Sequence, residues 1–221
     1  MNWWQRIIEF FKKLFGGGAD PMPSKFTNEE ERRQYYINLW PRARIIYNAQ
    51  HDRPRDVRTF IFDKSYILED VVNKYNLRGR NDTDTMYKIL SFVMDHLVYT
   101  SDEVTKKQAE YWQNPEDTIT LMKGDCEDGA ILIKSLSLVA GVPDWKVKIC
   151  AGHVKGGGHA YAVYVRDNDT QCILDWCYWT NRLPIDDRPK ISEESNYYDI
   201  WFSFTREHTF GEVDRKYGPN S

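Results

Sequence analysis

The chain has 221 residues, a net charge of −3 and a pI near 6.0, so its overall charge does not favour nucleic acid as a partner. Hydrophobic residues make up 41% of the sequence and aromatic residues 14%, a composition that excludes a disordered protein. The four cysteines have neither the paired spacing of a metal site nor the density of a disulfide scaffold. We therefore expect reduced thiols and a cytoplasmic location, although Cys172 and Cys177 could pair in an oxidising compartment.

The N-terminal segment predicts a separate module. Apolar residues recur at helical spacing over residues 2–15, with charged residues on the other side, so we expect an amphipathic helix within residues 1–18. Residues 16–18 are glycines that end it, and residues 19–25 form a linker to a domain at 26–221. We expect the helix to bind a membrane surface or a protein partner; the alternative is that it packs on its own domain. Charges interrupt its apolar residues and no cleavage site follows, so we expect neither a signal peptide nor a transmembrane segment, which needs ~20 apolar residues.

Residues 26–100 predict mainly helices. Thr27 and Glu30 have the spacing of a capping box, which starts a helix that ends near Leu39. Asp82 or Asp84 is expected to cap a later helix. The other elements expected here are a short strand at 59–62 and helices at 67–75 and 86–97.

The second half of the chain predicts one buried helix followed by strands. The helix begins at the Gly124–Gly129 segment and ends at Gly141. Strands are expected at 146–151, 159–166 and 171–176, with a late one at 200–204 and a turn at 167–169. Helices followed by an antiparallel sheet indicate the α+β class.

Cys126 is the candidate nucleophile. It lies among glycine and acidic residues at the first turn of the predicted buried helix, where free backbone N–H groups and the helix dipole favour a thiolate. Its own backbone N–H is a candidate oxyanion donor. Cys150 and Cys172 lie within apolar strands, where a thiol is usually an inert core residue.

His159 and Asp175 are the candidate base and its orienting acid. They fall on two consecutive predicted strands, and adjacent antiparallel strands bring such residues side by side. The carboxylate would then hold the imidazole in the productive tautomer. A zinc site at His153 and His159 is disfavoured because no matching ligand pair accompanies them.

Four motifs in this order resemble the transglutaminase-like superfamily, and within it the bacterial and viral transglutaminase-like cysteine proteinases. The motifs are Tyr111–Thr118, Gly124–Asp128, His159-Ala160-Tyr161 and Leu174-Asp175-Trp176. The resemblance covers roughly residues 83–180 and implies a papain-like fold, in which a nucleophile helix packs on an antiparallel sheet. It also implies that Cys126, His159 and Asp175 form a catalytic triad. The chain departs from the family pattern at Tyr161, where the family usually has Trp, and at Trp176, where Pro is frequent.

The resemblance also suggests residues around the triad. Trp112, Tyr161 and Trp176 are candidate substrate-binding residues, although these aromatic side chains could equally belong to the core. Some relatives bind calcium through the two acids that flank the nucleophile, here Asp125 and Glu127. The alternative is that these acids only cap the helix, and the triad chemistry itself requires no cofactor.

The sequence therefore predicts a cysteine-dependent amide hydrolase that acts on a protein or peptide through an acyl-enzyme thioester. Acyl transfer to an amine, as in a true transglutaminase, is the second possibility. The third is a structural or assembly protein that keeps the fold without catalysis. The resemblance to small phage-encoded relatives raises the option of a virion-associated protein.

Overall fold

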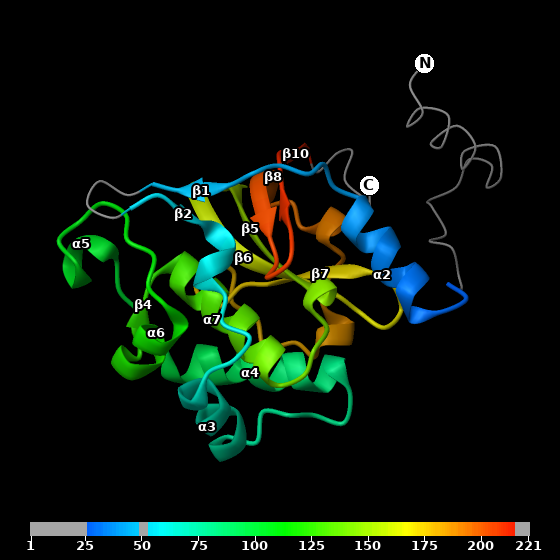
Figure 1. Cartoon of the computed structure of the whole chain (residues 1–221), viewed down its shortest axis with the longest axis horizontal. Coiled ribbons are helices and arrows are strands. Elements are labelled where there is room, and N and C mark those ends of the chain that lie inside the picture. Colours follow the sequence, from blue (N-terminus) through cyan, green and yellow to red (C-terminus); the bar gives the residue numbers. More distant parts are fainter. Residues whose placement is uncertain (1–25, 49–52, 215–221) are drawn as a thin grey trace.

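The computed structural model describes residues 26–48 and 53–214. Their largest element is a six-stranded antiparallel sheet with the order β10-β8-β5-β6-β7, in which β9 pairs with β8 (Figure 1). Its strands are β5 (Val147–Val154), β6 (Gly157–Val165), β7 (Gln171–Leu174), β8 (Tyr197–Phe204), β9 (Thr209–Phe210) and β10 (Val213–Asp214). The expected run of strands after the buried helix is confirmed.

Helices pack around this sheet, most of them on one side (Figure 1). The α-helices are α2 (Glu29–Asn38), α3 (Tyr66–Lys74), α4 (Asp82–His96), α5 (Asp102–Thr105), α6 (Pro115–Leu121) and α7 (Cys126–Val139). The 3₁₀ turns are η1 (Val57–Phe60), η2 (Asp144–Lys146), η3 (Ile185–Asp187) and η4 (Ile191–Glu193). Two small sheets join β1 (Ile46–Tyr47) to β2 (Arg55–Asp56), antiparallel, and β3 (Val98–Tyr99) to β4 (Lys123–Gly124), parallel. None of the helices in the described part of the chain is long and apolar enough to cross a membrane.

Helix α7 is the central element of the fold. Asp125 and Asp128 form a capping box at its start, and the helix ends before Gly141, which has a φ of +99°. Its residues are buried on nearly every side, because α3, α4 and α6 pack on it from one direction and β5 and β6 from the other. The expected nucleophile helix on an antiparallel sheet, and with it the α+β class, is confirmed.

Each face of the sheet has its own apolar core. The face toward α7 is packed with side chains from α3, α4 and α7, together with Tyr164 and Leu174. On the opposite face, Tyr161, Val163 and Ile173 pack against Trp40 and Ile191. Consecutive side chains of a strand point to opposite faces, so neighbouring residues of β6 and β7 lie in different cores.

Several local expectations were wrong in detail. Residues 57–60 form the 3₁₀ turn η1 instead of a strand, because the Asp56 carboxylate accepts a hydrogen bond from the Arg58 N–H and closes a turn. Helix α2 is capped by Asn28, one residue after Thr27, and α4 by Asn81 instead of Asp82 or Asp84. In each case an asparagine side chain accepts the hydrogen bond from the first turn. The predicted helix at residues 2–15 lies outside the described residues.

Candidate active site

His159 and Asp175 meet at one end of the β6–β7 pair. The antiparallel register of these strands, Ala162 opposite Leu174, carries both residues to the same end. The His159 Nε2 atom lies 2.7 Å from Asp175 Oδ2, and both side chains are buried. The other ring nitrogen, Nδ1, is therefore the one available to take a proton from a thiol.

The Asp175 carboxylate accepts further hydrogen bonds. The Tyr197 hydroxyl donates to the same Oδ2 at 2.7 Å, while the backbone N–H groups of Cys177 and Tyr178 donate to Oδ1. Burial by itself would raise the pKa of Asp175, but the hydrogen bond and charge of His159, helped by Tyr197, hold it below its usual value. Sequence reasoning missed Tyr197, because a tyrosine 22 residues beyond Asp175 carries no motif and depends on the position of β8.

Cys126 is the first residue of α7, as expected, but its surroundings are acidic. Its Sγ donates a hydrogen bond to Glu127 Oε2 at 3.1 Å. Burial, and then the charge of Glu127, raise the pKa of the Cys126 thiol, although a backbone hydrogen bond from Ala160 acts in the opposite direction. A compensating positive charge near Glu127 would favour the thiolate.

The acids around Cys126 form a cluster of potential metal ligands. Oxygens of Asp102, Glu110 and Glu127 lie within 4.8 Å of one another, and so do oxygens of Asp102, Asp125 and Asp128. Within the described residues, one buried oxygen each of Asp102, Asp125 and Glu127 has no hydrogen-bond partner. Buried carboxylate oxygens without partners are what a hard cation such as calcium requires.

Burial is also the main cause of the unusual pKa values in this cluster. It raises the pKa of Asp125 to about 7 and that of Asp128 to about 6, and it raises the pKa of Glu127 well above its usual value. The acids that flank Cys126 were expected from the sequence. Asp102 and Glu110 were not, because they come from a separate segment, 24 and 16 residues before Cys126, whose only signal is a pair of scattered acids.

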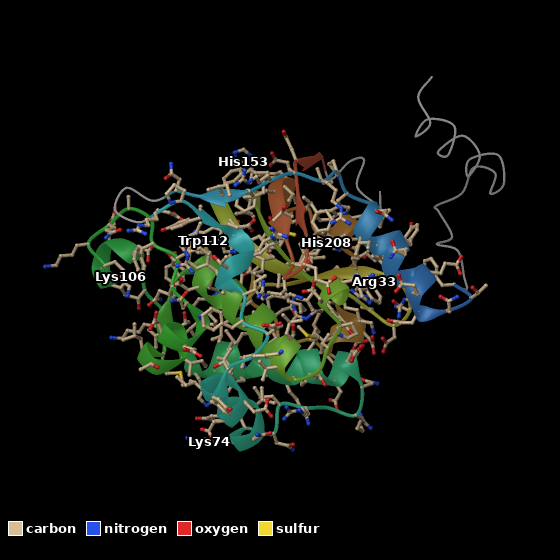
Figure 2. The ribbon with its side chains drawn as sticks, in the orientation of Figure 1. Arg33, Lys74, Lys106, Trp112, His153 and His208 are labelled. Atoms are coloured by element: carbon tan, nitrogen blue, oxygen red, sulfur yellow. The ribbon has the colours of Figure 1, made fainter. Side chains whose placement is uncertain are left out.

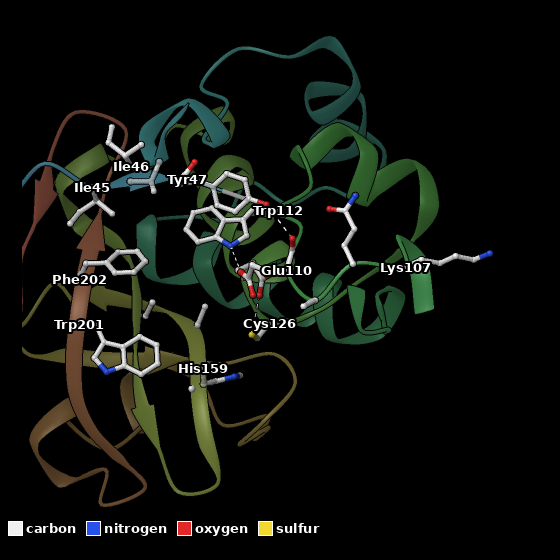
Figure 3. Close-up of a pocket in the computed structure, with 18 residues that line it drawn as sticks. Ile45, Ile46, Tyr47, Lys107, Glu110, Trp112, Cys126, His159, Trp201 and Phe202 are labelled. Atoms are coloured by element: carbon white, nitrogen blue, oxygen red, sulfur yellow. Dashed lines mark hydrogen bonds between the residues drawn. The ribbon is translucent and has the colours of Figure 1, made fainter. Parts of the chain in front are cut away.

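A cleft of about 820 Å³ contains both Cys126 and His159 (Figure 3). Helix α7, β1, β6 and β8 all contribute to it, together with the segment 107–110. In the close-up, Trp201 and Phe202 lie on one side of Cys126 and Lys107 lies on the other. A cleft of this size, with a thiol and an imidazole in its wall, can hold several residues of a peptide.

The three candidate substrate-binding aromatics occupy different positions. Trp112 lines the cleft, is 8% exposed, and lies well inside the molecule, in contrast to His153 at its margin (Figure 2). Tyr161 is fully buried beneath His159 and packs edge-on against Tyr197. Trp176 lies on the first turn of α7, where its Nε1 donates to the Cys126 carbonyl at 3.4 Å. Trp112 is therefore among the described residues that line the cleft, whereas Tyr161 and Trp176 are not.

The chain belongs to the transglutaminase-like family. The family model described as a transglutaminase-like domain matches residues 69–187, which is more than half of the chain. The resemblance read from the four sequence motifs is therefore confirmed. A curated relative, the UPF0252 protein PH1321 of Pyrococcus horikoshii, is 36% identical over 102 residues, or 45% of this chain. The matched region spans only 29% of that relative's length.

Solved structures share the fold. The chain is similar to calcium-bound LapG of Legionella pneumophila, with a TM-score of 0.51 and 23% identity over 65% of this chain and 74% of LapG. EGTA-treated LapG gives the same TM-score, with 20% identity over 67% of this chain and 89% of that structure. Identities this low show a common fold and leave the chemistry to be argued from the residues.

Proposed function

We propose that the protein is a cysteine-dependent amide hydrolase whose substrate is a protein or peptide. The observation that carries the proposal is the buried His159–Asp175 hydrogen bond of 2.7 Å beside a cleft that also contains Cys126. A buried carboxylate that orients an imidazole next to a thiol is the arrangement that nucleophilic catalysis needs.

The reaction would proceed in two steps. Nδ1 of His159 takes the Cys126 proton, the sulfur attacks the amide carbonyl, and the imidazolium then protonates the departing amine, which leaves a thioester on Cys126. Water attacks the thioester, His159 takes its proton, and the carboxylic acid product leaves as the thiol re-forms. Asp175 holds the ring and stabilises the imidazolium in both steps.

Calcium belongs to this proposal as a supporting ion. The unpartnered oxygens of Asp102, Asp125 and Glu127 would hold it, and a cation there would offset the negative charge beside Cys126. The calcium-bound form of LapG supports this reading for a chain of the same fold.

The mutational test starts from the thiol. In the full-length protein with calcium, we expect Cys126→Ala to abolish labelling by an acyl-trapping amide probe and His159→Ala to abolish turnover. Asp175→Asn should lower kcat by several orders of magnitude, because the wrong tautomer is then favoured. Cys150→Ala is the matched control and should keep full labelling. Labelling of the Cys126→Ala protein at the wild-type level would reject the assignment.

Acyl transfer to an amine is the second candidate, because water and amines attack the same thioester. Exclusion of water from the acyl group decides between them. Polar residues such as Lys107 and Glu110 line part of the cleft, which does not favour the exclusion of water. We therefore expect the carboxylate product to dominate when a cleavable peptide is incubated with millimolar primary amine and the products are weighed by mass spectrometry. Predominant amine adduct would make the protein a transglutaminase.

A further inference from the structure

Trp201 forms an exposed aromatic wall of the cleft because of a bulge in β8. Ala151 of β5 pairs with Phe202, but the next residue, Gly152, pairs with Ile200, so Trp201 has no partner in the register. In a regular strand, consecutive side chains point to opposite faces. The bulge instead lets Trp201 and Phe202 line the same cleft, which is how bulges redirect side chains next to active sites.

Gly158 lets the indole lie against the strand that carries the imidazole. A Cβ at Gly158 would come within 2.7 Å of the Trp201 Cη2 atom, so any other residue would push the ring away. Gly158 directly precedes His159 on β6. The third glycine of the 156–158 segment therefore has a packing function at the active site, distinct from the left-handed backbone of Gly156 and Gly157.

His153 fixes the other end of the same ring. The His153 ring meets the Trp201 ring edge to face at 4.6 Å, with the indole Nε1 2.9 Å from His153 Nδ1. The Asp199 carboxylate, 2.8 Å from the same His153 nitrogen, lies beside them. The indole is thus held at both ends although 38% of the residue is exposed. A large apolar surface that is fixed and exposed is characteristic of a binding site.

We propose that Trp201, Phe202 and Ile45 form a specificity subsite for a large apolar side chain of the substrate, aromatic or branched aliphatic. The proposal rests on the hydrolase function and adds the substrate class. The three side chains lie on one side of the cleft, and the polar residue Lys107 lies on the other (Figure 3). The subsite and the thiol share one cleft, so its occupant is a residue of the polypeptide that Cys126 attacks.

The experiment measures preference and its dependence on Trp201. Full-length protein with calcium digests a peptide library, and mass spectrometry of the products gives the residue preference at each position around the cleaved bond. We expect a large apolar residue at one fixed position. Trp201→Ala should lower kcat/KM for the preferred peptide by about 10- to 100-fold and change it little for the same peptide with alanine there, since an apolar pocket discriminates by about that much.

Two further variants separate packing from folding. Tyr198 lies on the same strand, is 50% exposed, and is not among the described residues that line the cleft. Tyr198→Ala should therefore keep the preference. His153→Ala keeps the indole but removes the ring that packs edge-on against it, so it should weaken the preference to an intermediate degree. Cleavage without any apolar preference, or an unchanged preference in Trp201→Ala, would overturn the subsite.

A binding readout keeps the subsite independent of catalysis. Fluorescence anisotropy measures labelled library peptides on the Cys126→Ala protein. The subsite is supported if peptides with a large apolar residue bind more tightly than alanine peptides, and if adding Trp201→Ala to the Cys126→Ala protein abolishes this difference. That result would stand even if wild-type protein cleaves nothing and the hydrolase proposal fails. Equal binding of apolar and alanine peptides rejects the subsite whether or not cleavage occurs.

Discussion

At the scale of single residues, Tyr197 has the clearest untested role. Its buried hydroxyl and His159 Nε2 share one oxygen of Asp175, and Tyr197 is not among the described residues that line the cleft. In the proposed reaction it would therefore be a positioning residue that acts through Asp175. Its loss should change how tightly the carboxylate holds a protonated imidazole.

We expect Tyr197→Phe to lower kcat by roughly 10-fold with little change in KM, because Asp175 loses a hydrogen bond that orients it toward His159, and a hydrogen bond to a charged group is worth about 1.5–3 kcal/mol. Without the hydroxyl, Asp175 becomes more basic and stabilises the imidazolium, so the acidic limb of the kcat/KM profile should move to higher pH. Steady-state kinetics from pH 5 to 9 measures both. Tyr164→Phe, a buried tyrosine of β6 whose hydroxyl meets Thr83, is the control. A fall in kcat with an unmoved limb would mean that Tyr197 serves the fold only.

Lys148 in the middle of β5 is a second residue with a measurable consequence. Its side chain is fully buried, donates to the Tyr36 carbonyl at 3.2 Å, and lies over the Trp40 ring at 4.5 Å. Burial lowers the pKa of Lys148 to about 8, so the lysine is charged in the folded protein at pH 7 and the folded state bears the desolvation.

We expect Lys148→Met to raise the free energy of unfolding at pH 7 by roughly 1–3 kcal/mol, as replacement of buried charges by apolar residues of similar size does. The folded pKa lies below the unfolded one, so wild-type stability rises as pH increases from about 8 toward the unfolded value of ~10.4. The advantage of the methionine should shrink over that range. Urea titrations at pH 7 and 10 test this, and a constant difference would contradict the buried charge.

At the scale of elements, the start of α7 concentrates acids where a metal would be expected. We expect calcium to raise the melting temperature of the full-length protein and magnesium to do so much less, because the smaller ion gives up its water reluctantly. The paired substitution Asp125→Asn and Glu127→Gln should remove the calcium shift. Differential scanning calorimetry with EGTA, calcium or magnesium measures it. The exposed acid Asp186, changed to Asn, is the control.

The predictability of these elements followed the range of the interactions that form them. Helix α7 and strands β6 and β7 have local signals, namely a capping box, a terminal glycine and apolar runs, so the positions of Cys126, His159 and Asp175 could be anticipated. The bulge that exposes Trp201 and the hydroxyl of Tyr197 depend on the pairing of β8 with β5, which no local pattern encodes. Asp102 and Glu110 join the acidic cluster through contacts between segments far apart in the sequence, which no local pattern encodes either.

At the scale of the whole molecule, residues 1–18 are proposed to attach the domain that follows to a membrane surface or a partner protein. The sequence motivates this through the apolar stripe of residues 2–15 and a net charge of about +2 from Arg6, Lys12 and Lys13 against Glu9. The described domain has an apolar core on each face of the sheet, and residues 26–48 already contribute Trp40 and Tyr47 to these cores. Removal of the first 18 residues should therefore leave that core intact.

We expect protein lacking residues 1–18 to unfold at the same urea concentration as the full chain and to label equally at Cys126. It should no longer sediment with liposomes that contain anionic lipid, nor retain the partner that the full chain retains. Substitution of Trp3 and Ile7 by aspartate in the full-length chain is the matched control, because it removes the apolar stripe and keeps the length. Loss of cooperative unfolding in the truncated protein would show that the segment packs on its own domain, since deletion would then expose apolar surface that the segment covers.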